Sequence, residues 1–548
     1  MKEQSTKAVA KKKFFKMVFS RAGIFVILIL VQMLIFLGIP YYLKEYATFI
    51  YSVMSLMEII VLVYIINTEG NPAFKLSWIL CVMAVPVVGT IFYIYVHLQL
   101  ETRFVQNRLA ALRMETEPYM DQDQKITDAL WEGKSANAQL SYYLSHQLGF
   151  PTYRNTEAEY FPVGEAKFAS MIKELEKAEK FIFMEYFIVA KSYMWNTILE
   201  ILKEKAAQGV EVRMMYDGMC SLALLPYGYY KDLEKMGIQS IPFSQIRPVL
   251  STYQNNRDHR KILIIDGKTV FTGGINLADE YINRIDRFGH WKDTAVMIQG
   301  EAVKIFTLLF LKMWHVAKGK DSIPEEEIRK YTVEVWENTQ ADEMRADMES
   351  MRNTDMQNTQ DKKLHAGGYV IPYGDDPYGD ERIGKQVYID ILNRARKYVH
   401  IMTPYLILDD EMITALRYCA KRGVETVIIM PHIPDKIYAY LLARTYYKQL
   451  LKYGVKIYEY TPGFVHAKVF VSDDIRGCVG TINLDFRSLY LHFECGAYMY
   501  SNDVLHDVEQ DFKETLKQCQ EITKESCDKY PKGKMLVGKM LRLIAPLM

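Results

Sequence analysis

One short pattern occurs twice in the chain and decides its fold. The first copy reads His259-Arg260-Lys261, then Ile262-Leu263-Ile264-Ile265, then Asp266, and later Gly273-Gly274-Ile275-Asn276. The second reads His466-Ala467-Lys468, then Val469-Phe470-Val471-Ser472, then Asp473, and later Gly480-Thr481-Ile482-Asn483. Relative to its histidine, each copy has lysine at +2, aspartate at +7, glycine at +14 and asparagine at +17. Chance does not readily produce this match, so the pattern indicates a duplicated unit.

Each copy has the sequence pattern of a buried strand, with its histidine and lysine at the start of that strand. The apolar, β-branched runs after the histidines end at turn residues, as buried strands do. Because side chains alternate along a strand, each histidine shares a face with its lysine, and the aspartate faces the other way. A single histidine at a strand start is more often structural. Two matched copies favour a catalytic face.

The duplication extends beyond the motif. Ala178-Glu179-Lys180 and Ala395-Arg396-Lys397 each precede a strand-like segment, and so do Gly209-Val210-Glu211 and Gly423-Val424-Glu425. The numbering offset between the copies is 217 for the first pair and 214 for the second, but only 207 for the histidines, so the first copy carries an insertion around 247–258. Strands alternate with helices in each copy. This predicts an α/β fold of two tandem sandwich lobes with largely buried sheets.

A chain of 548 residues is too long for one ordinary domain. We expect a membrane-anchoring segment at 1–98, a charged connector at 99–135, a first lobe at 136–344, an interlobe linker at 345–363, a second lobe at 364–530 and a basic amphipathic tail at 531–548. The net charge of +1 is small for a nucleic-acid-binding protein. Seven cysteines without a Cys-x-x-Cys pair indicate neither a disulfide framework nor a cysteine zinc site.

Three apolar stretches near the N-terminus predict two to three transmembrane helices, at about 22–43, 46–66 and 76–96. The second contains Glu58 and could instead lie in the membrane interface. The basic stretch 1–21 should stay on the cytoplasmic side, and the arginines after the third apolar stretch favour the same side. Three crossings cannot satisfy both signals. Either one of the apolar stretches does not cross the membrane, or the N-terminus lies outside the cell. We expect a multi-pass protein of the bacterial cell membrane with its lobes on the cytoplasmic side.

The end of the chain, 531–548, has two interpretations. Apolar side chains fall on one helical face, with basic side chains among them: Leu536, Met540, Leu543, Ile544 and Leu547, and Lys532, Lys534, Lys539 and Arg542. This is typical of a cationic helix that lies on a membrane surface. A terminal helix packed on the second lobe would account for the same pattern.

The paired His-x-Lys-x4-Asp motifs with a downstream Gly-x-x-Asn resemble the phospholipase D superfamily over roughly residues 136–530. More narrowly, the chain resembles bacterial cardiolipin synthases. That resemblance rests on Asn71-Pro72-Ala73-Phe74-Lys75-Leu76-Ser77-Trp78 with Pro86 and Gly89, on Gly273-Gly274-Ile275-Asn276, on Thr403-Pro404-Tyr405, and on Asn483-Leu484-Asp485-Phe486-Arg487-Ser488.

The resemblance implies that the lobes meet about a pseudo-two-fold axis and bring both motifs to one site. It implies transfer of a phosphatidyl group between two phosphatidylglycerol molecules, with His259 as nucleophile and His466 as acid and base. Lys261, Lys468, Asn276 and Asn483 would hold the phosphate. Asp293 and Glu494, at +34 and +28 from the histidines, resemble the family's histidine-orienting acids. Asp266 and Asp473 belong to the catalytic motif, but their strand face predicts a supporting position.

No metal or cofactor is expected, because four positioned donors can stabilise the phosphate. The nearest alternative is a membrane phospholipase D that hydrolyses or transphosphatidylates other phospholipids with the same residues. A superfamily nuclease is disfavoured by the apolar N-terminus and the lack of basic excess, so no nucleic-acid partner is expected. A scaffold without activity is disfavoured because both histidines, both lysines and both asparagines are present.

Overall fold

The computed structural model describes residues 21–98, 100–133, 135, 137–221, 223–245, 255–337 and 365–547. These form two compact units, 1–100 with 543–548, and 101–542. The basic stretch 1–20, the interlobe linker at 345–363 and most of the extra segment before the first motif lie outside the described residues.

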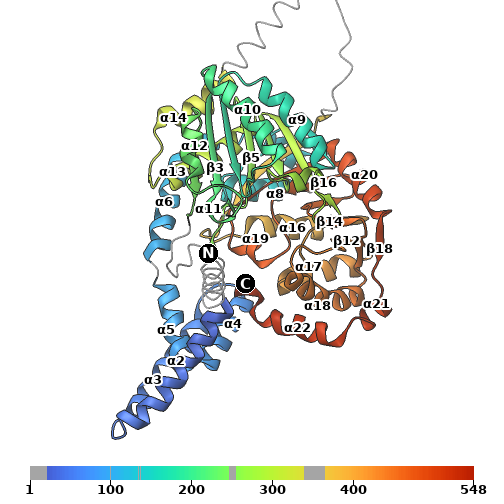
Figure 1. Cartoon of the computed structure of the whole chain (residues 1–548). Coiled ribbons are helices and arrows are strands. Elements are labelled where there is room, and N and C mark those ends of the chain that lie inside the picture. The colour runs from blue at the N-terminus through green and yellow to red at the C-terminus, as the bar shows by residue number, and fades with distance from the viewer. Residues whose placement is uncertain are drawn as a thin grey trace, which may run out of the picture. The chain divides into compact units, whose positions relative to one another are not determined.

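The first lobe, labelled at β3, β5 and α10 in Figure 1, is built on one sheet. That sheet has eight strands in the order β4-β3-β2-β5-β6-β8-β1-β9. Strands β2, β3 and β4 are parallel neighbours, and β5 joins β2 in antiparallel fashion. The strands are β1 (Thr156–Phe161), β2 (Phe181–Tyr186), β3 (Glu211–Asp217), β4 (Gln239–Phe243), β5 (Lys261–Ile265), β6 (Thr269–Gly273), β8 (Ala295–Gly300) and β9 (His365–Ala366). The principal helices are α9 (Gly164–Glu176), α10 (Tyr193–Ala207), α12 (Tyr229–Lys235) and α13 (Val303–Ala317).

The motif strand β5 is buried along its whole length because both faces of the sheet are covered. Leu263 and Ile265 belong to the core that also holds Met171 of α9 and Trp195 of α10. The opposite face of the sheet packs against α13, and Ile262 there is fully buried. A strand that is covered on both faces has a continuous apolar sequence. The apolar run of the motif therefore predicted this buried strand.

The second lobe repeats this arrangement in the sheet β10-β17-β16-β15-β11-β12-β13-β18. Its first seven strands match β1-β8-β6-β5-β2-β3-β4 in order, so the prediction of two tandem α/β lobes is confirmed. The strands are β10 (Tyr369–Asp375), β11 (Tyr398–Met402), β12 (Glu425–Pro431), β13 (Lys456–Tyr460), β15 (Val469–Ser472), β16 (Arg476–Gly480), β17 (Glu494–Tyr500) and β18 (Cys519–Glu521). The principal helices are α16 (Ile383–Arg394), α17 (Asp410–Lys421), α18 (Ile437–Tyr453) and α20 (Val504–Leu516).

Two short backbone pairings join the lobes. Strand β7 (His290–Lys292) of the first lobe runs parallel to β14 (Gly463–Val465) of the second. On the other side, Asp258 forms a parallel bridge with Phe493. Each pairing ends at a motif histidine: His466 N–H donates to the Lys292 carbonyl at 2.7 Å, and His259 N–H donates to the Phe493 carbonyl at 2.9 Å. The backbone of each lobe thus fixes the histidine of the other.

The connector after residue 99 contains helices α6 (Leu100–Thr116), α7 (Gln124–Glu132) and α8 (Ala138–Tyr142). Asp123 precedes α7 and caps it, because its carboxylate accepts the Lys125 N–H at 2.9 Å. The boundaries of the connector and of the two lobes stay predictions.

The N-terminal unit contains α2 (Arg21–Tyr42), α3 (Ala47–Asn67), α4 (Pro72–Ala84) and α5 (Pro86–His97). Among the described residues, α3 alone is long and apolar enough to count as a membrane span. The prediction of a single spanning helix at 76–96 is wrong. Pro86 cannot continue the hydrogen-bond ladder of α4, and the chain folds back there. The Trp78 ring consequently lies 6.4 Å from the ring of His97, so α4 and α5 form a hairpin.

The tail forms α22 (Lys532–Ile544). One side of this helix packs on the second lobe, and apolar side chains remain exposed, as a membrane-surface helix would have. A β-carbon at the buried Gly538 would lie 2.4 Å from the Leu441 carbonyl oxygen, so this glycine lets α22 rest on α18. Leu536 and Met540 remain mostly exposed. Within the N-terminal unit, Ser77 Oγ donates to the Leu543 carbonyl at 2.9 Å.

The β7–β14 pairing makes a prediction about Gly463. A β-carbon there would lie 2.4 Å from the His290 carbonyl oxygen, so Gly463→Ala should force the two strands apart and cost about 1–3 kcal/mol. Thermal unfolding of the detergent-solubilised protein should show a lower midpoint. Gly533→Ala is the matched control, since no atom lies within 4 Å of the new methyl group and alanine favours a helix. Equal midpoints for the two variants would contradict this account.

Candidate active site

The two motif histidines lie at the junction of the lobes, each just before a motif strand; Lys261 is the first residue of β5, and Lys468 directly precedes β15. His259 precedes β5 and His466 precedes β15, and the two residues are 6% and 7% exposed. The two backbone pairings that join the lobes end at these histidines, so both motifs lie at the same junction. Lys261, Lys468 and His466 are near enough to act electrostatically on His259.

Each histidine is held by an acid from the opposite lobe. His259 Nδ1 lies 2.9 Å from Glu494 Oε1, and His466 Nδ1 lies 2.7 Å from Asp293 Oδ2. Both carboxylates are fully buried. The acids therefore contact the histidine of the other repeat, an exchange that counting along the chain does not reveal. With Nδ1 engaged, Nε2 is the ring nitrogen left for chemistry in both histidines.

The acids are themselves positioned. Thr481 Oγ1 donates to Glu494 Oε2, and the Thr294 N–H donates to Asp293 Oδ1 at 2.8 Å. Gly274 occupies the place of Thr481 in the first repeat, where a β-carbon would lie 2.0 Å from Asp293 Oδ1. Sequence reasoning did not single out Thr481. The available signal was its offset of +15 from its histidine, which is the same as that of Gly274.

The histidines are surrounded by different aromatic groups. The His466 ring contacts Trp291 and Tyr281, with centroid distances of 5.5 and 5.7 Å. The His259 ring contacts Phe187 at 4.8 Å and a third histidine, His492, at 5.4 Å. The two halves of the site are therefore not chemically equivalent.

Both lysines are buried beside the histidines, and each ammonium group donates to the backbone carbonyl of the histidine in its own motif. Burial lowers the pKa of Lys261 to about 8, although Glu494 and Asp293 oppose the shift. Burial lowers the pKa of Lys468 to about 7, and Lys261 contributes to that shift. An anionic ligand would favour the charged form of both groups.

Burial also disfavours charge on the histidines. It lowers the pKa of His466 to about 4, with a contribution from Lys468 and an opposing effect of Asp293. It lowers the pKa of His259 well below the usual range, aided by Lys261 and Lys468. Burial would raise the pKa of Asp293, but His466 and Lys468 outweigh it and keep this carboxyl ionised. Near neutral pH the empty site therefore holds neutral imidazoles.

Asn276 and Asn483 follow β6 and β16 and are buried. Asn276 Oδ1 accepts the Ile188 N–H at 3.0 Å, and its Nδ2 donates to the Tyr281 hydroxyl at 2.8 Å. Asn483 Oδ1 has no hydrogen-bond partner among the described residues. The Asn276 amide is thus fixed with one further N–H available as a donor.

The resemblance groups Asp266 and Asp473 with the catalytic residues, but the structure places them at the far ends of β5 and β15. The Asp266 carboxylate accepts the N–H groups of 179, 180 and 181 at 2.7–2.8 Å. Asp473 accepts those of 396, 397 and 398 at 2.8–2.9 Å. Both adopt a left-handed backbone conformation. They close the strand ends and contact none of the histidines, as their strand face predicted.

Sequence reasoning also missed Lys167 of α9, which is fully buried. Its ammonium group lies 3.3 Å from the Ile275 carbonyl oxygen, next to Asn276. Burial lowers its pKa to about 7, although Asp293 opposes the shift. In the second lobe, the Tyr388 hydroxyl donates at 2.8 Å to the corresponding carbonyl of Ile482. Different side chains therefore support the same turn in the two repeats.

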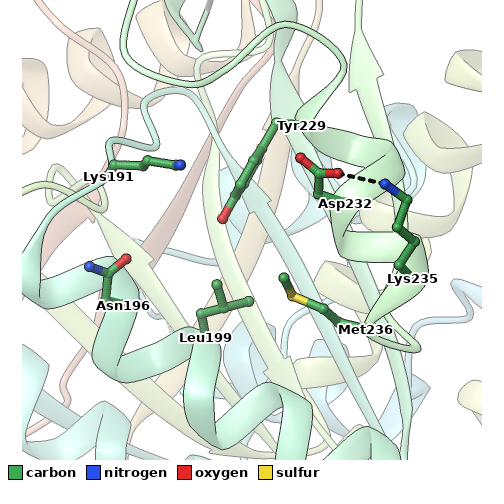
Figure 2. A pocket seen from close by; sticks show the side chains of 7 residues that line it. All are labelled: Lys191, Asn196, Leu199, Tyr229, Asp232, Lys235 and Met236. Carbon is green, nitrogen blue, oxygen red and sulfur yellow. Dashed lines mark hydrogen bonds and ion pairs between the residues drawn. The ribbon is translucent and has the colours of Figure 1, made fainter.

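A separate hollow of about 400 Å³ opens between α10 and α12 (Figure 2). The Asp232 carboxylate in its wall pairs with the Lys235 ammonium at 3.0 Å, and the Tyr229 hydroxyl accepts a hydrogen bond from Trp195 at 2.8 Å. No motif residue lines this hollow. The hollow is therefore separate from the site that the two histidines form.

The chain is similar to known proteins in sequence and in fold. The family model described as "Cardiolipin synthase, PLD-like domain" matches residues 171–314 and 388–516. The chain is 31% identical to a cardiolipin synthase of a Geobacillus species over 91% of this chain and 93% of the relative. It is 49% identical to a protein of Streptococcus mutans described as uncharacterized, over 88% of this chain and 99% of the relative. The crystal structure of a phosphatidylserine synthase from Haemophilus influenzae superposes with a TM-score of 0.53 at 15% identity, covering 71% of this chain and 95% of that one, which shows a shared fold.

Proposed function

The chain belongs to the cardiolipin synthase family of phospholipase D-like proteins, and from this premise we propose how its buried site carries out the reaction. It is a phosphatidyltransferase that acts on membrane phospholipid. The substrate we assign is phosphatidylglycerol, which serves as both donor and acceptor and yields cardiolipin and glycerol. The observation that carries this mechanism is the pair of crossed acid–histidine contacts, because these leave Nε2 of both imidazoles free in one site.

In the first step, His259 Nε2 attacks the phosphorus of one phosphatidylglycerol. The P–O bond to the glycerol headgroup breaks as the P–N bond forms, and the protonated His466 gives its proton to the departing oxygen, so glycerol leaves. The anionic phosphodiester raises the affinity of His466 for a proton when it binds, which offsets the effect of burial. A phosphatidyl group is then attached to His259.

In the second step, the neutral His466 removes a proton from a glycerol hydroxyl of the second phosphatidylglycerol. That oxygen attacks phosphorus, the P–N bond breaks, and cardiolipin forms while His466 regains the proton. Glu494 and Asp293 orient the imidazoles and stabilise their positive charge. Lys261, Lys468, Asn276 and Asn483 stabilise the phosphoryl oxygens, and no step requires a metal ion.

The primary test supplies the purified protein with phosphatidylglycerol alone in liposomes and measures cardiolipin and free glycerol. Equal amounts of the two are expected. His259→Ala and His466→Ala should each lower the rate by at least about 10³-fold, because each removes one partner of a two-step exchange. Phosphatidic acid in place of cardiolipin would identify a hydrolase that uses the same site.

The same proposal assigns the covalent intermediate to His259. With phosphatidylglycerol labelled in the phosphate, quenching at early times with denaturant at mildly alkaline pH, which preserves the P–N bond, followed by peptide mapping at the same pH should find the label on the peptide that contains His259. A label on the His466 peptide would reverse the two roles and leave the overall reaction intact.

The lowered lysine pKa values predict the pH profile. Because Lys468 and Lys261 lose their protons near about 7 and about 8 in the empty site, kcat/KM should fall as pH rises through that range. Lys468→Arg should move this alkaline limb upward, since a guanidinium stays protonated there. An unmoved limb in this variant would assign it to another group, such as His466.

The N-terminal unit supports an arrangement in which α2 and α3 cross the membrane and the α4–α5 hairpin enters without crossing. Helices of 13 and 12 residues extend about 20 Å each, which is less than the ~30 Å hydrocarbon core. Two crossings keep the basic N-terminus and the arginines after α5 on one side, which we take to be the cytoplasm. This arrangement removes the conflict that three crossings created.

We further assign α22 to the membrane surface. Its exposed apolar side chains and basic groups suit the anionic substrate lipid. Met540→Asp should lower transfer on phosphatidylglycerol vesicles by about fivefold or more, since apolar contact with lipid is lost. The rate on detergent-dispersed short-chain phosphatidylglycerol should not change. Ile475→Asp, at an exposed turn, is the control; equal losses on both substrates in the Met540 variant would contradict the assignment.

A further inference from the structure

A third histidine stands beside the pair formed by His259 and Glu494. His492 is 8% exposed, and both of its ring nitrogens are buried with no hydrogen-bond partner among the described residues. Its Nδ1 lies 3.6 Å from Glu494 Oε1, which is too far for a hydrogen bond. A buried imidazole without a hydrogen bond on either nitrogen lowers the stability of the folded state. His492 has no part in the proposed phosphatidyl transfer.

The three side chains form a potential ligand set. One nitrogen from His259, one from His492 and one oxygen from Glu494 all lie within 4.8 Å of one another. Glu494 Oε1 is the oxygen nearest His492, and it lies 2.9 Å from His259 Nδ1, while Thr481 holds the other oxygen. Two imidazoles and one carboxylate make up a ligand type that proteins use for zinc with an open fourth position.

The second histidine–acid pair provides an internal comparison. Trp291 stands two positions before Asp293, as His492 does before Glu494. The Trp291 ring also contacts its histidine at nearly the same distance, 5.5 Å against 5.4 Å. Indole offers no lone pair to a metal, so the pair of His466 and Asp293 lacks a third ligand.

We propose that His259, His492 and Glu494 bind a divalent transition-metal ion of the zinc type, and that the bound ion inhibits the enzyme. Nitrogen ligands favour Zn²⁺, Co²⁺ and Ni²⁺ over Mg²⁺ and Ca²⁺. The neighbouring Lys261 and Lys468 weaken cation binding, so the ion binds reversibly rather than as a permanent constituent.

Inhibition follows from the tautomers of His259. In the metal-free site, Nδ1 carries the ring proton toward Glu494 and Nε2 keeps the lone pair that attacks phosphorus. An ion on Nδ1 forces the single ring proton of the neutral imidazole onto Nε2. That nitrogen then has no free electron pair, and the P–N bond cannot form. This consequence rests on the proposed function, whereas the binding itself does not.

The binding test uses the full-length, untagged protein in detergent, treated with chelator and then titrated with Co²⁺. The visible absorption of bound Co²⁺ should saturate at one ion per chain, and Zn²⁺ but not Mg²⁺ should displace it. His492→Asn and His492→Phe should each weaken binding by at least about 10–100-fold. His506→Asn, which removes an exposed histidine, is the matched control and should bind as the wild type does.

The inhibition test measures transfer with added Zn²⁺, relative to the metal-free rate of each variant. Zn²⁺ should inhibit the wild type and the His506 variant, chelator should restore the rate, and the His492 variants should resist. Circular dichroism shows whether each variant is folded. Binding that persists in both folded His492 variants, or equal inhibition of all variants, would overturn the proposal. If the wild type transfers no phosphatidyl group, the function fails while the Co²⁺ titration still decides the site.

Discussion

The structure of the catalytic unit depends on two short parallel pairings between its lobes. Without β7 beside β14, and Asp258 beside Phe493, each lobe would hold a histidine with no carboxylate at Nδ1. The pairings bring the two backbones into direct hydrogen bonding at the residues next to the histidines. Because the acid follows each pairing strand in one lobe and the histidine follows it in the other, the contact that joins the lobes also assembles the site.

This arrangement explains the distribution of polar groups around the site. A buried carboxylate costs free energy unless it is hydrogen-bonded. Glu494 contacts His259 and accepts from the Thr481 hydroxyl, and Asp293 contacts His466 and accepts from the Thr294 N–H. The motif aspartates show the same principle at the other end of the strands, where each accepts three backbone N–H groups. His492 departs from it, because both of its ring nitrogens are buried without a hydrogen-bond partner among the described residues. The lack of hydrogen bonds at His492 is the observation behind its proposed role as a metal ligand.

The membrane segment follows a different constraint. Residues 76–96 are apolar enough for a crossing, but Pro86 interrupts the backbone hydrogen bonds of a continuous helix and Gly89 admits the returning chain against the Cys81 carbonyl. Hydropathy measures only the side chains and therefore does not detect such a break. This break is what the proposed topology rests on, in which the α4–α5 hairpin enters the membrane without crossing it.

The sequence by itself determined the duplication, the α/β class of both lobes, the strand position that each motif histidine shares with its lysine, and the placement of Asp266 and Asp473 away from the histidines. These follow from local periodicity and spacing, which are properties of one strand and its neighbours. The tertiary structure alone decided that Glu494 serves His259 and Asp293 serves His466, that Thr481 supports Glu494, and that His492 lies beside the site. Those contacts join residues far apart in the chain and in different lobes. Spacing within one repeat carries no information about them, because they depend on how the two lobes pair.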